Sequence, residues 1–312
     1  MLICGIIIFM EIPITQSEAW HILQKDLGEK SIFIKEKNYQ FVAIIKPIPM
    51  GNYLYCPYGP IAKDKESFKL AIDALKKIAT EEKAIFIRVE PFQATEAKYL
   101  PKNTVKSQDL NPKETWLLDL QGSEEDLSSK LPSRLLRYYR GREQKGITIE
   151  TSHDSADIHF LLELQRALAR QKKISTFSEH YLQTELKQPF ATLYLAKKDQ
   201  QVIAAGLVFD DEHTRYNLQG AQSDTGRKLH ATGILTIQLI KDAKKKGLKT
   251  FDFWGIAPDD AGPDHPWAGF TNFKKTFTGK EFDHAGTYDI ILDRTKYNLY
   301  KILRKVNRLL HR

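Results

Sequence analysis

The stretch that decides the fold reads FDFWGIAPDDAGPDHPWAGFTNFKKTF and spans Phe251–Phe277. A short apolar strand, Phe251–Trp254, precedes a glycine and then a loop rich in Asp, Pro and His. The loop leads into a lysine pair, Lys274–Lys275, with phenylalanines on both sides. A strand, a polar loop and a cation on a short helix together present a charge to a ligand bound at a strand end.

The lysine pair is the first candidate for chemistry. Phe270, Phe273 and Phe277 recur at spacings of three and four residues, which predicts one apolar face on a short helix. Lys274 and Lys275 then project beside or away from that face. An ammonium group held in a dry pocket stabilises negative charge that develops on an oxygen in a transition state. Solvated surface lysines are far more common, so the pattern alone leaves both interpretations open.

Composition indicates a globular protein with basic character. The chain has 312 residues, which suggests two domains of ordinary size, and 42% of them are hydrophobic. A formal net charge of +8 makes polyanions such as tRNA, pyrophosphate-bearing lipids or an acidic membrane face plausible partners. Cys4 and Cys56 provide neither a disulfide framework nor a metal-binding spacing, so we expect a reducing compartment.

The N-terminal segment Met1–Met10 is apolar but much shorter than the roughly 20 residues that cross a bilayer. It lacks the basic start and the cleavage site of a signal peptide. We interpret it as a buried first strand or as extra residues from an upstream start codon. No other stretch is uncharged for long enough to span a membrane, so we expect a cytoplasmic protein.

Helix and strand patterns occur in two successive sets along the chain. The first set comprises Ser17–Leu27, Ser31–Lys35, Phe41–Ile45, Tyr53–Cys56, Ser67–Thr80, Ala84–Val89 and a closing strand, Trp116–Leu120. The second comprises Ser133–Lys145, Ile147–Glu150, Ala156–Lys172, Ala191–Lys197, Val202–Phe209, Thr214–Gln219, Ile234–Lys246 and Thr250–Trp254. These sets predict an α+β protein of two similar units.

The C-terminal segment Tyr297–Arg312 is predicted to be a basic amphipathic helix. Its apolar stripe comprises Leu299, Ile302, Leu303, Val306, Leu309 and Leu310. Its cations include Lys301, Arg304, Lys305, Arg308 and Arg312. We expect the stripe to dock the helix onto a domain. A further hypothesis is peripheral contact between the basic face and the anionic inner face of the cytoplasmic membrane.

Three further groups of polar residues allow more than one interpretation. Asp252 could orient or deprotonate an attacking amine, or simply hold the backbone at a strand end. A basic helix with interleaved tyrosines could contact a tRNA backbone or be a solvated face. Its residues are Arg134, Arg137, Tyr138, Tyr139, Arg140 and Arg142. The third group, Asp259, Asp260, Asp264 and His265, fits no standard metal-binding spacing, so we expect no metal site.

Several motifs, in this order, resemble those of the Fem family of peptidoglycan-bridge aminoacyltransferases. They are Gln16–Ser17 with Trp20, Tyr58–Gly59–Pro60, Arg88–Val89–Glu90–Pro91, Thr115–Leu120, the basic stretch Arg134–Gly146, Ala243–Gly247 and Phe251–Gly255. The resemblance covers nearly the whole chain from about residue 15. Its specificity lies in the order and spacing of the motifs, since no single motif is decisive.

The resemblance implies two tandem GNAT-like (acyl-CoA N-acyltransferase-like) domains, with the C-terminal segment returning to the first. The expected boundaries are 1–121 with about 293–312, and 122–292. Because Arg134–Gly146 runs directly into a strand, the chain resembles a compact form that lacks the family's helical hairpin. The family's Phe-Lys pair, implicated in stabilising the transition state, corresponds to Phe273 and Lys274, with Lys275 as the alternative.

Acceptor binding is expected to differ from the family pattern. Some relatives carry an arginine four residues before a tyrosine that contacts the acceptor; here the tyrosine is Tyr181, but the arginine position is Phe177. The alternative for Tyr181 is ordinary helix packing. Phosphate contact is then expected from Arg170, Arg227 or Lys228. Trp254, Lys275 and Arg140 complete the expected substrate-binding residues.

The expected activity is aminoacyl transfer from tRNA to the stem-peptide amine of a peptidoglycan precursor, lipid II or a UDP-MurNAc-peptide. The ester of aminoacyl-tRNA is already activated, so we expect no cofactor. One alternative is a GNAT-type acyltransferase using acyl-CoA. Its glycine-rich phosphate loop is missing before Ile234–Lys246, where the sequence reads RKLHATG. The other alternative is a relative that only binds tRNA or precursor.

Overall fold

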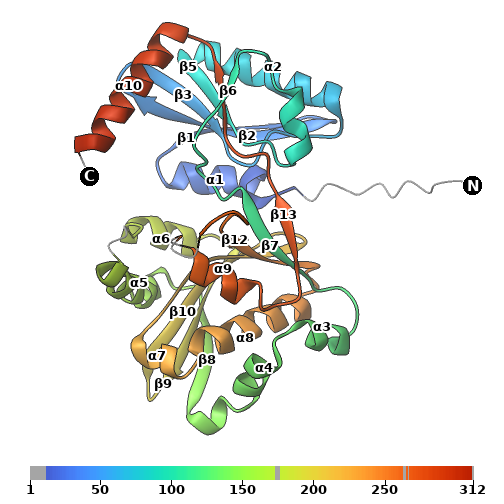
Figure 1. The fold of residues 1–312 in the computed structure, drawn as a ribbon, viewed down its shortest axis with the longest axis vertical. Helices are drawn as coiled ribbons and strands as arrows, with labels where there is room; N and C mark the ends of the chain where they lie inside the picture. The colour runs from blue at the N-terminus through green and yellow to red at the C-terminus, as the bar shows by residue number, and fades with distance from the viewer. Residues whose placement is uncertain (1–11, 173–175, 263–264, 266, 311–312) are drawn as a thin grey trace, which may run out of the picture. The chain divides into compact units, whose positions relative to one another are not determined.

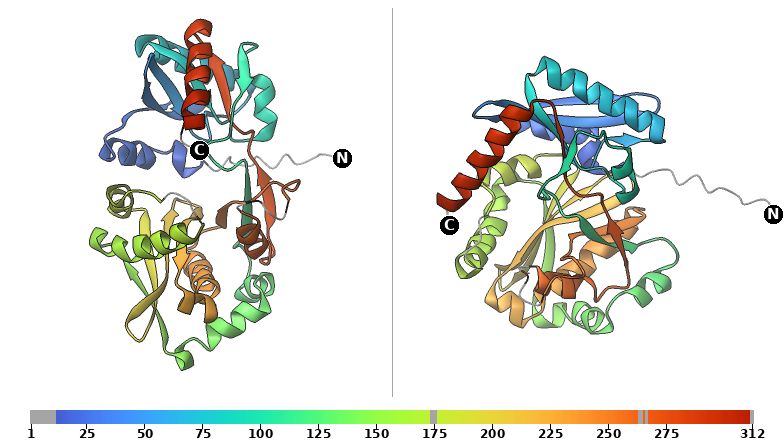
Figure 2. Two further views of the ribbon diagram at one scale, coloured as in Figure 1. Left: turned by 60° about the vertical axis from the view of Figure 1, so that its left-hand side comes forward. Right: turned by 45° about the horizontal axis from the view of Figure 1, so that its top comes forward.

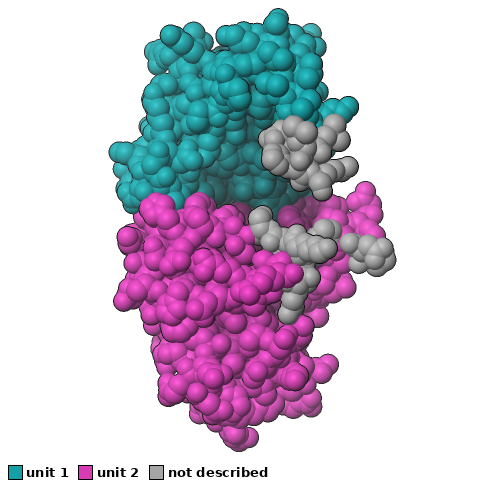
Figure 3. Space-filling model, turned by 90° about the vertical axis from the view of Figure 1, so that its left-hand side faces the viewer, with its two compact units in different colours: residues 1–113, 283–312 teal, residues 114–282 magenta. Residues whose placement is uncertain are grey.

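A computed structural model describes residues 12–172, 176–262, 265 and 267–310, so both interpretations of Met1–Met10 lie outside the described residues. The chain divides into two units, Met1–Lys113 with Asp283–Arg312 and Glu114–Phe282, coloured teal and magenta in Figure 3. Across the described ranges, every helix falls short of the length and apolar character that a bilayer crossing demands.

Unit 1 is built on a sheet with the strand order β1–β2–β3–β5–β14–β6, in which β4 pairs with β2 (Figure 1). β3 and β5 are parallel, and their neighbours in the sheet are antiparallel. The elements are α1 (Glu18–Asp26), β1 (Lys30–Lys35), β2 (Tyr39–Ile48), β3 (Gly51–Cys56), β4 (Ile61–Ala62), α2 (Lys65–Glu81), β5 (Ala84–Val89), β6 (Thr104–Lys106), β14 (Tyr288–Ile291) and α10 (Arg294–Leu310).

Alternating side chains on β5 face the two helices of this sheet. Ile87 and Val89 belong to the apolar cluster under α2, whereas the ring of Phe86 contacts that of Tyr297 on α10 at a centroid distance of 5.2 Å. Arg88, on the same face as Phe86, forms a bidentate pair with Asp289. The helices α2 and α10 therefore cover opposite faces of the unit 1 sheet (Figure 2).

The expected docking of α10 through its leucine stripe is wrong. Leu299, Ile302, Leu303 and Val306 are 46, 59, 42 and 46% exposed, and the side chains of Leu309 and Leu310 lie outside the described part. The buried side of the helix is aromatic instead, since Tyr297 and Tyr300 pack against Phe86. Stripe hydrophobicity alone did not reveal that tyrosines on the opposite face also bury a large apolar area.

Unit 2 has a sheet in the order β13–β7–β12–β11–β10–β9–β8. Its strands are β7 (Glu114–Asp119), β8 (Ile147–Ser152), β9 (Ala191–Lys198), β10 (Gln201–Asp210), β11 (Thr214–Gln222), β12 (Thr250–Gly255) and β13 (Lys280–Asp283). Its helices are α3 (Glu124–Lys130), α4 (Ser133–Arg140), α5 (Ile158–Lys172), α6 (Glu179–Leu186), α7 (Asp224–Lys228), α8 (Ala231–Lys245) and α9 (Ala268–Lys274).

Strand β7 belongs to unit 2, although the sequence pattern placed Trp116–Leu120 at the close of the first half. It pairs antiparallel with β12, with Thr250 opposite Asp119. At the other end of the unit, β14 pairs with β5 and so returns to the unit 1 sheet before residue 293. The chain therefore passes from one unit to the other after residues 113 and 282 rather than at 121 and about 293.

The basic helix is also shorter than predicted. α4 ends at Arg140 with Gly141 as its C-cap, and a separate 3₁₀ turn, Glu143–Lys145, ends at Gly146 with a φ of 68°. Glycine tolerates this left-handed conformation, which turns the chain directly into β8. No helical hairpin intervenes among the described residues between α4 and β8.

The two units repeat one plan. Each contains a parallel strand pair joined through a helix, β3–α2–β5 in unit 1 and β11–α8–β12 in unit 2, within an otherwise antiparallel neighbourhood. The expectation of two similar α+β units is thereby confirmed. In unit 2 the parallel pair also creates the candidate site.

Candidate functional site

The site begins where the parallel strands β11 and β12 separate. Their pairing ends at Tyr216 opposite Asp252, after which β11 continues beside β10 and β12 continues beside β7. The register of β12 shifts between Asp252 and Gly255, and Trp254 adopts a φ of 64°. This left-handed residue redirects β12 and leaves one side of β11 uncovered.

A cavity of about 750 Å³ lies along the exposed part of β11. The residues that line it come from β11, the α7–α8 region, α9, α4 and α5 of unit 2. They are Leu135, Leu168, Asn217, Leu218, Gln219, Gly220, Ala221, Gln222, Arg227, His230, Thr232, Gly233, Thr236, Gly269, Phe270, Phe273 and Lys274. This volume is in the range that holds a small ligand or the end of a larger one.

Lys274, at the end of helix α9, lies in the wall of this cavity. The ring of Phe277 is fully buried and contacts Phe253 at 4.8 Å and Phe273 at 5.5 Å, so the helix is fixed to β12 through aromatic packing. The expected apolar face of three phenylalanines is only partly correct, because Phe270 is 45% exposed and lines the cavity instead. Lys274 therefore projects beside the anchored face.

The ammonium group of Lys274 is held in place by the end of β12, the strand that turns away from β11. Its Nζ donates a hydrogen bond to the carbonyl oxygen of Gly255 at 2.6 Å. Burial lowers the pKa of Lys274 to about 8, and the nearby negative charge of Asp252 partly offsets this decrease. The Lys274 amine is therefore mainly protonated at neutral pH. Because little water surrounds it, its positive charge interacts strongly with other charges in the cavity.

Asp252 supports this lysine from within β12. Its carboxyl group is 6% exposed, and its Oδ1 accepts hydrogen bonds from the Thr115 hydroxyl and from the backbone N–H of Trp254. Burial raises the pKa of Asp252 to about 6, against the opposite effects of both hydrogen bonds and of the Lys274 charge. Asp252 is therefore mainly ionised at neutral pH and faces a lysine that needs a counter-charge.

Lys275 points to a different environment. Its Nζ pairs with Asp259 at 2.9 Å and Glu281 at 3.2 Å, and it lies 5.6 Å from the ring centroid of Trp116. Lys275 is not among the described residues that line the cavity. Asp259 is thus engaged by a lysine, and Asp264 of the same acidic loop lies outside the described residues.

The start of α8 also contributes to the cavity wall. His230 caps this helix in a left-handed conformation with a φ of 58°, and Thr232 and Gly233 of the first turn line the cavity. The N–H of Thr232 donates to the Gln222 side chain at 3.3 Å, so one of the free N–H groups of the first turn is already engaged. Arg227 of α7 also lines the cavity and is largely solvent-accessible.

A basic aromatic cluster adjoins the cavity at His230. The His230 ring stacks on Tyr138 of α4 at 4.3 Å with an interplanar angle of 5°. Arg134, Arg137 and Lys145 surround the same tyrosine at 5.0–5.7 Å from its ring centroid. Arg140, another candidate of this helix, is exposed at its last turn and is not among the described residues that line the cavity.

The remaining expected residues are placed elsewhere in unit 2. Tyr181 of α6 stacks on Phe177 at 5.0 Å, and its hydroxyl is hydrogen-bonded to the buried carboxyl of Glu185. Trp254 makes an edge-to-face contact with Tyr216, and Lys228 is exposed on α7. The described residues that line the cavity do not include Tyr181, Trp254 or Lys228.

Sequence reasoning missed the amide side chains of β11. Asn217, Gln219 and Gln222 line the cavity, and Gln219 is hydrogen-bonded to Gln165 of α5 at 3.0 Å. The available signal was a run of amides in a strand that begins with buried residues.

Comparison with known proteins gives a family and a fold. A model described as the FemAB family matches residues 144–305, which is more than half of this chain. No curated protein sequence matches it.

Three solved structures have the same fold. The structure of FemX is 18% identical, covers 92% of this chain and 94% of its own, and superposes with a TM-score of 0.79. L-PGS from Bacillus licheniformis is 16% identical, with coverage of 94% and 92% and a TM-score of 0.59. A tandem GNAT protein from the clavulanic acid biosynthesis pathway is 10% identical, with coverage of 81% and 78% and a TM-score of 0.52. These matches confirm the α+β fold of two tandem GNAT-like domains.

Proposed function

Because the chain belongs to the FemAB family, we propose that it transfers an aminoacyl group from aminoacyl-tRNA to the stem-peptide amine of a peptidoglycan precursor. Membership supports a transferase, and aminoacyl transfer in cell-wall or lipid synthesis in particular. The observation that carries the finer proposal is the Lys274 ammonium, fixed at the Gly255 carbonyl in the wall of a cavity.

In this reaction an amine nitrogen attacks the ester carbonyl carbon of aminoacyl-tRNA. A C–N bond forms, the C–O bond to the ribose breaks, and the amine proton goes to the departing oxygen through a proton carrier. The tetrahedral intermediate has a negative oxygen, which a fixed ammonium group stabilises. We assign this role to Lys274, with Phe273 holding α9 against the buried Phe277.

Asp252 is best described as the group that keeps Lys274 charged. Its Oδ1 is already engaged by Thr115 and Trp254, and Asp252 is not among the described residues that line the cavity. Its negative charge nevertheless favours the protonated form of Lys274. Asp252 thus acts in this proposal as a positioning residue, while the attacking amine must lose its proton to another group or to water.

One side of the cavity carries groups suited to contact the end of an RNA. Arg227 and His230 lie in its wall, and the stack of His230 on Tyr138 connects it to Arg134 and Arg137. Cations beside aromatic rings are typical of single-stranded nucleic-acid contacts. We therefore assign the aminoacylated 3′ end to this side of unit 2.

The exposed stripe of α10 supports peripheral membrane contact. Its leucine, isoleucine and valine side chains are accessible, and Lys301 and Lys305 are exposed on the same helix. Such a helix binds anionic lipid surfaces. Co-sedimentation with phosphatidylglycerol vesicles should be weakened by Ile302→Ser, and an unchanged bound fraction would contradict this contact.

Product mass tests the activity. The protein is incubated with a mixed pool of charged tRNA and, separately, with lipid II or a UDP-MurNAc-peptide. A mass gain of one aminoacyl residue, abolished in Lys274→Ala and retained in the exposed-lysine control Lys280→Ala, supports the proposal. An acetyl-sized gain that requires acetyl-CoA would instead identify an acyl-CoA transferase.

A further inference from the structure

A second cavity lies within unit 1, on the face of the sheet that α10 covers. It has a volume of about 420 Å³ and is lined by the end of β6, by β5 and β14, and by α10. Its residues are Arg88, Lys106, Ser107, Gln108, Asp289, Tyr297, Tyr300, Lys301, Arg304 and Lys305. All of them belong to the same unit, so the cavity is a property of this domain alone.

The base of this cavity is a buried polar network of Arg88, Asp289 and Tyr297. Arg88 donates to both carboxylate oxygens of Asp289, at 2.7 and 2.8 Å, and Tyr297 donates to the same carboxylate at 2.8 Å. Arg88 and Asp289 are 2 and 1% exposed, and their charges cancel. This network is rigid, because each group is held by at least two partners or by packing.

One group at this base is left able to bind a ligand. The Ser107 hydroxyl oxygen accepts a hydrogen bond from Arg88 at 3.1 Å, so its own hydrogen is free to be donated toward the cavity. Asp289 offers no such freedom, since Arg88 and Tyr297 already occupy its oxygens.

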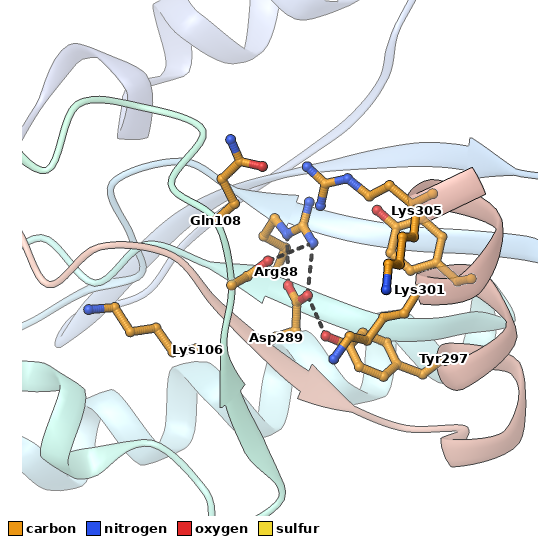
Figure 4. Close-up of a pocket in the computed structure, with 10 residues that line it drawn as sticks. Arg88, Lys106, Gln108, Asp289, Tyr297, Lys301 and Lys305 are labelled. Atoms are coloured by element: carbon orange, nitrogen blue, oxygen red, sulfur yellow. Dashed lines mark hydrogen bonds and ion pairs between the residues drawn. The ribbon is translucent and has the colours of Figure 1, made fainter. Parts of the chain in front are cut away.

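The wall contributed by α10 is strongly cationic. Figure 4 shows Lys301 and Lys305 reaching from this helix toward Arg88 and Asp289, whereas the amine of Lys106 points to the far side. Lys301, Arg304 and Lys305 form no ion pair with any residue in the described part of the chain.

Three like charges beside one cavity repel each other, so their arrangement is most stable with an anion among them. The cations converge on a single cavity rather than following a groove. These three cations are suited to bind a ligand that carries several negative charges close together. We propose that this cavity binds a compact di- or triphosphate group, held by Lys301, Arg304 and Lys305 with the Ser107 hydroxyl at its base.

Helix geometry favours a soluble phosphate over a lipid headgroup. Tyr297, Lys301 and Arg304 lie at spacings of four and three and share the face that meets the cavity. Leu299 and Val306 lie about half a turn away and are exposed. A bilayer that met the apolar stripe would therefore be on the other side of α10 from the cavity.

Calorimetric titration of the full-length protein with inorganic pyrophosphate at low salt tests this site. We expect one binding event that weakens as salt is added. Arg304→Ala and Lys301→Ala should each weaken binding by about tenfold or more, because each removes a charge-assisted contact. Arg304→Lys should restore part of the loss. Lys296→Ala removes a charge from the same helix outside the cavity and should change affinity by no more than about twofold.

Two further titrations distinguish the source of the phosphate, using ATP and phosphatidylglycerol vesicles. ATP binding that the same two variants weaken supports a nucleotide-type ligand, and vesicle binding should be weakened more by Ile302→Ser than by either of them. The proposal is overturned if pyrophosphate does not bind, or if all three alanine variants lose affinity equally. It is also overturned if an acceptor-stem RNA, but not pyrophosphate, depends on Arg304 and Lys301. None of these measurements requires aminoacyl transfer, so their failure leaves the proposed function untouched.

Discussion

Lys274→Met removes the ammonium group from the main cavity while keeping a side chain of similar length. The wild-type amine is held at 2.6 Å from the Gly255 carbonyl oxygen, close to where we place the developing oxyanion. Loss of one such stabilising group typically costs about 10²–10³ in kcat, equivalent to roughly 3–4 kcal/mol. We expect kcat to fall by this amount, with a smaller change in KM.

The same change should not destabilise the protein. The Lys274 pKa is lowered from 10.5 to about 8, so holding the charged form in the folded state costs at most about 3 kcal/mol at neutral pH. Methionine avoids this cost, although Asp252 then loses its nearby cation. We expect an unfolding midpoint equal to or above that of the wild type. Any advantage should disappear as pH rises above 10.5, where the lysine is neutral in both states.

Single-turnover transfer from an aminoacylated minihelix, measured beside urea unfolding, separates these two effects. Lys280→Met serves as the control, since Lys280 is exposed on β13. A folded Lys274→Met protein that transfers at more than about a third of the wild-type rate would refute the electrostatic role, because the expected loss is at least about a hundredfold. A variant that is both inactive and unfolded would refute the stability reasoning.

Three other predictions concern unit 2. The kcat value should fall above pH 8 as Lys274 is neutralised, because only the charged amine stabilises the oxyanion; a kcat that stays level from pH 7 to 9 would contradict this role. Asp252→Asn removes the negative charge that favours the protonated Lys274, so this alkaline limb should move to lower pH, and an unmoved limb would show that Asp252 does not support the Lys274 charge. Gly226→Ala places a Cβ against the Ile203 carbonyl oxygen, so urea unfolding should show a loss of about 1–3 kcal/mol, and unchanged stability would mean that α7 shifts freely.

Much of the fold could be predicted because its elements carry strong local patterns. Asp64 and Ser123 cap α2 and α3 as short polar side chains do at helix starts, and β10 is apolar along nearly its whole length. Partner choice was harder to predict. The sequence of β7 indicates a strand, but the neighbour that it pairs with depends on the register of β12 some 130 residues later.

The site was only partly predictable for a related reason. The Phe-Lys pattern identified Lys274, and the structure places it in a cavity wall. The position of Phe270 and the stacking of Tyr138 on His230 depend on how α4, α8 and α9 approach each other. Such tertiary contacts leave no periodic signal in the chain. The aromatic face of α10 was missed because the leucine stripe is the stronger hydrophobic signal.

The most direct measurement is a crystal structure with a stable analogue of the aminoacylated adenosine, in which an amide replaces the ester. We expect the adenosine end between α8 and α9, with the carbonyl oxygen of the analogue about 2.7–3.2 Å from Lys274 Nζ. An analogue bound outside this cavity, or with its carbonyl turned away from Lys274, would contradict the proposed catalytic role.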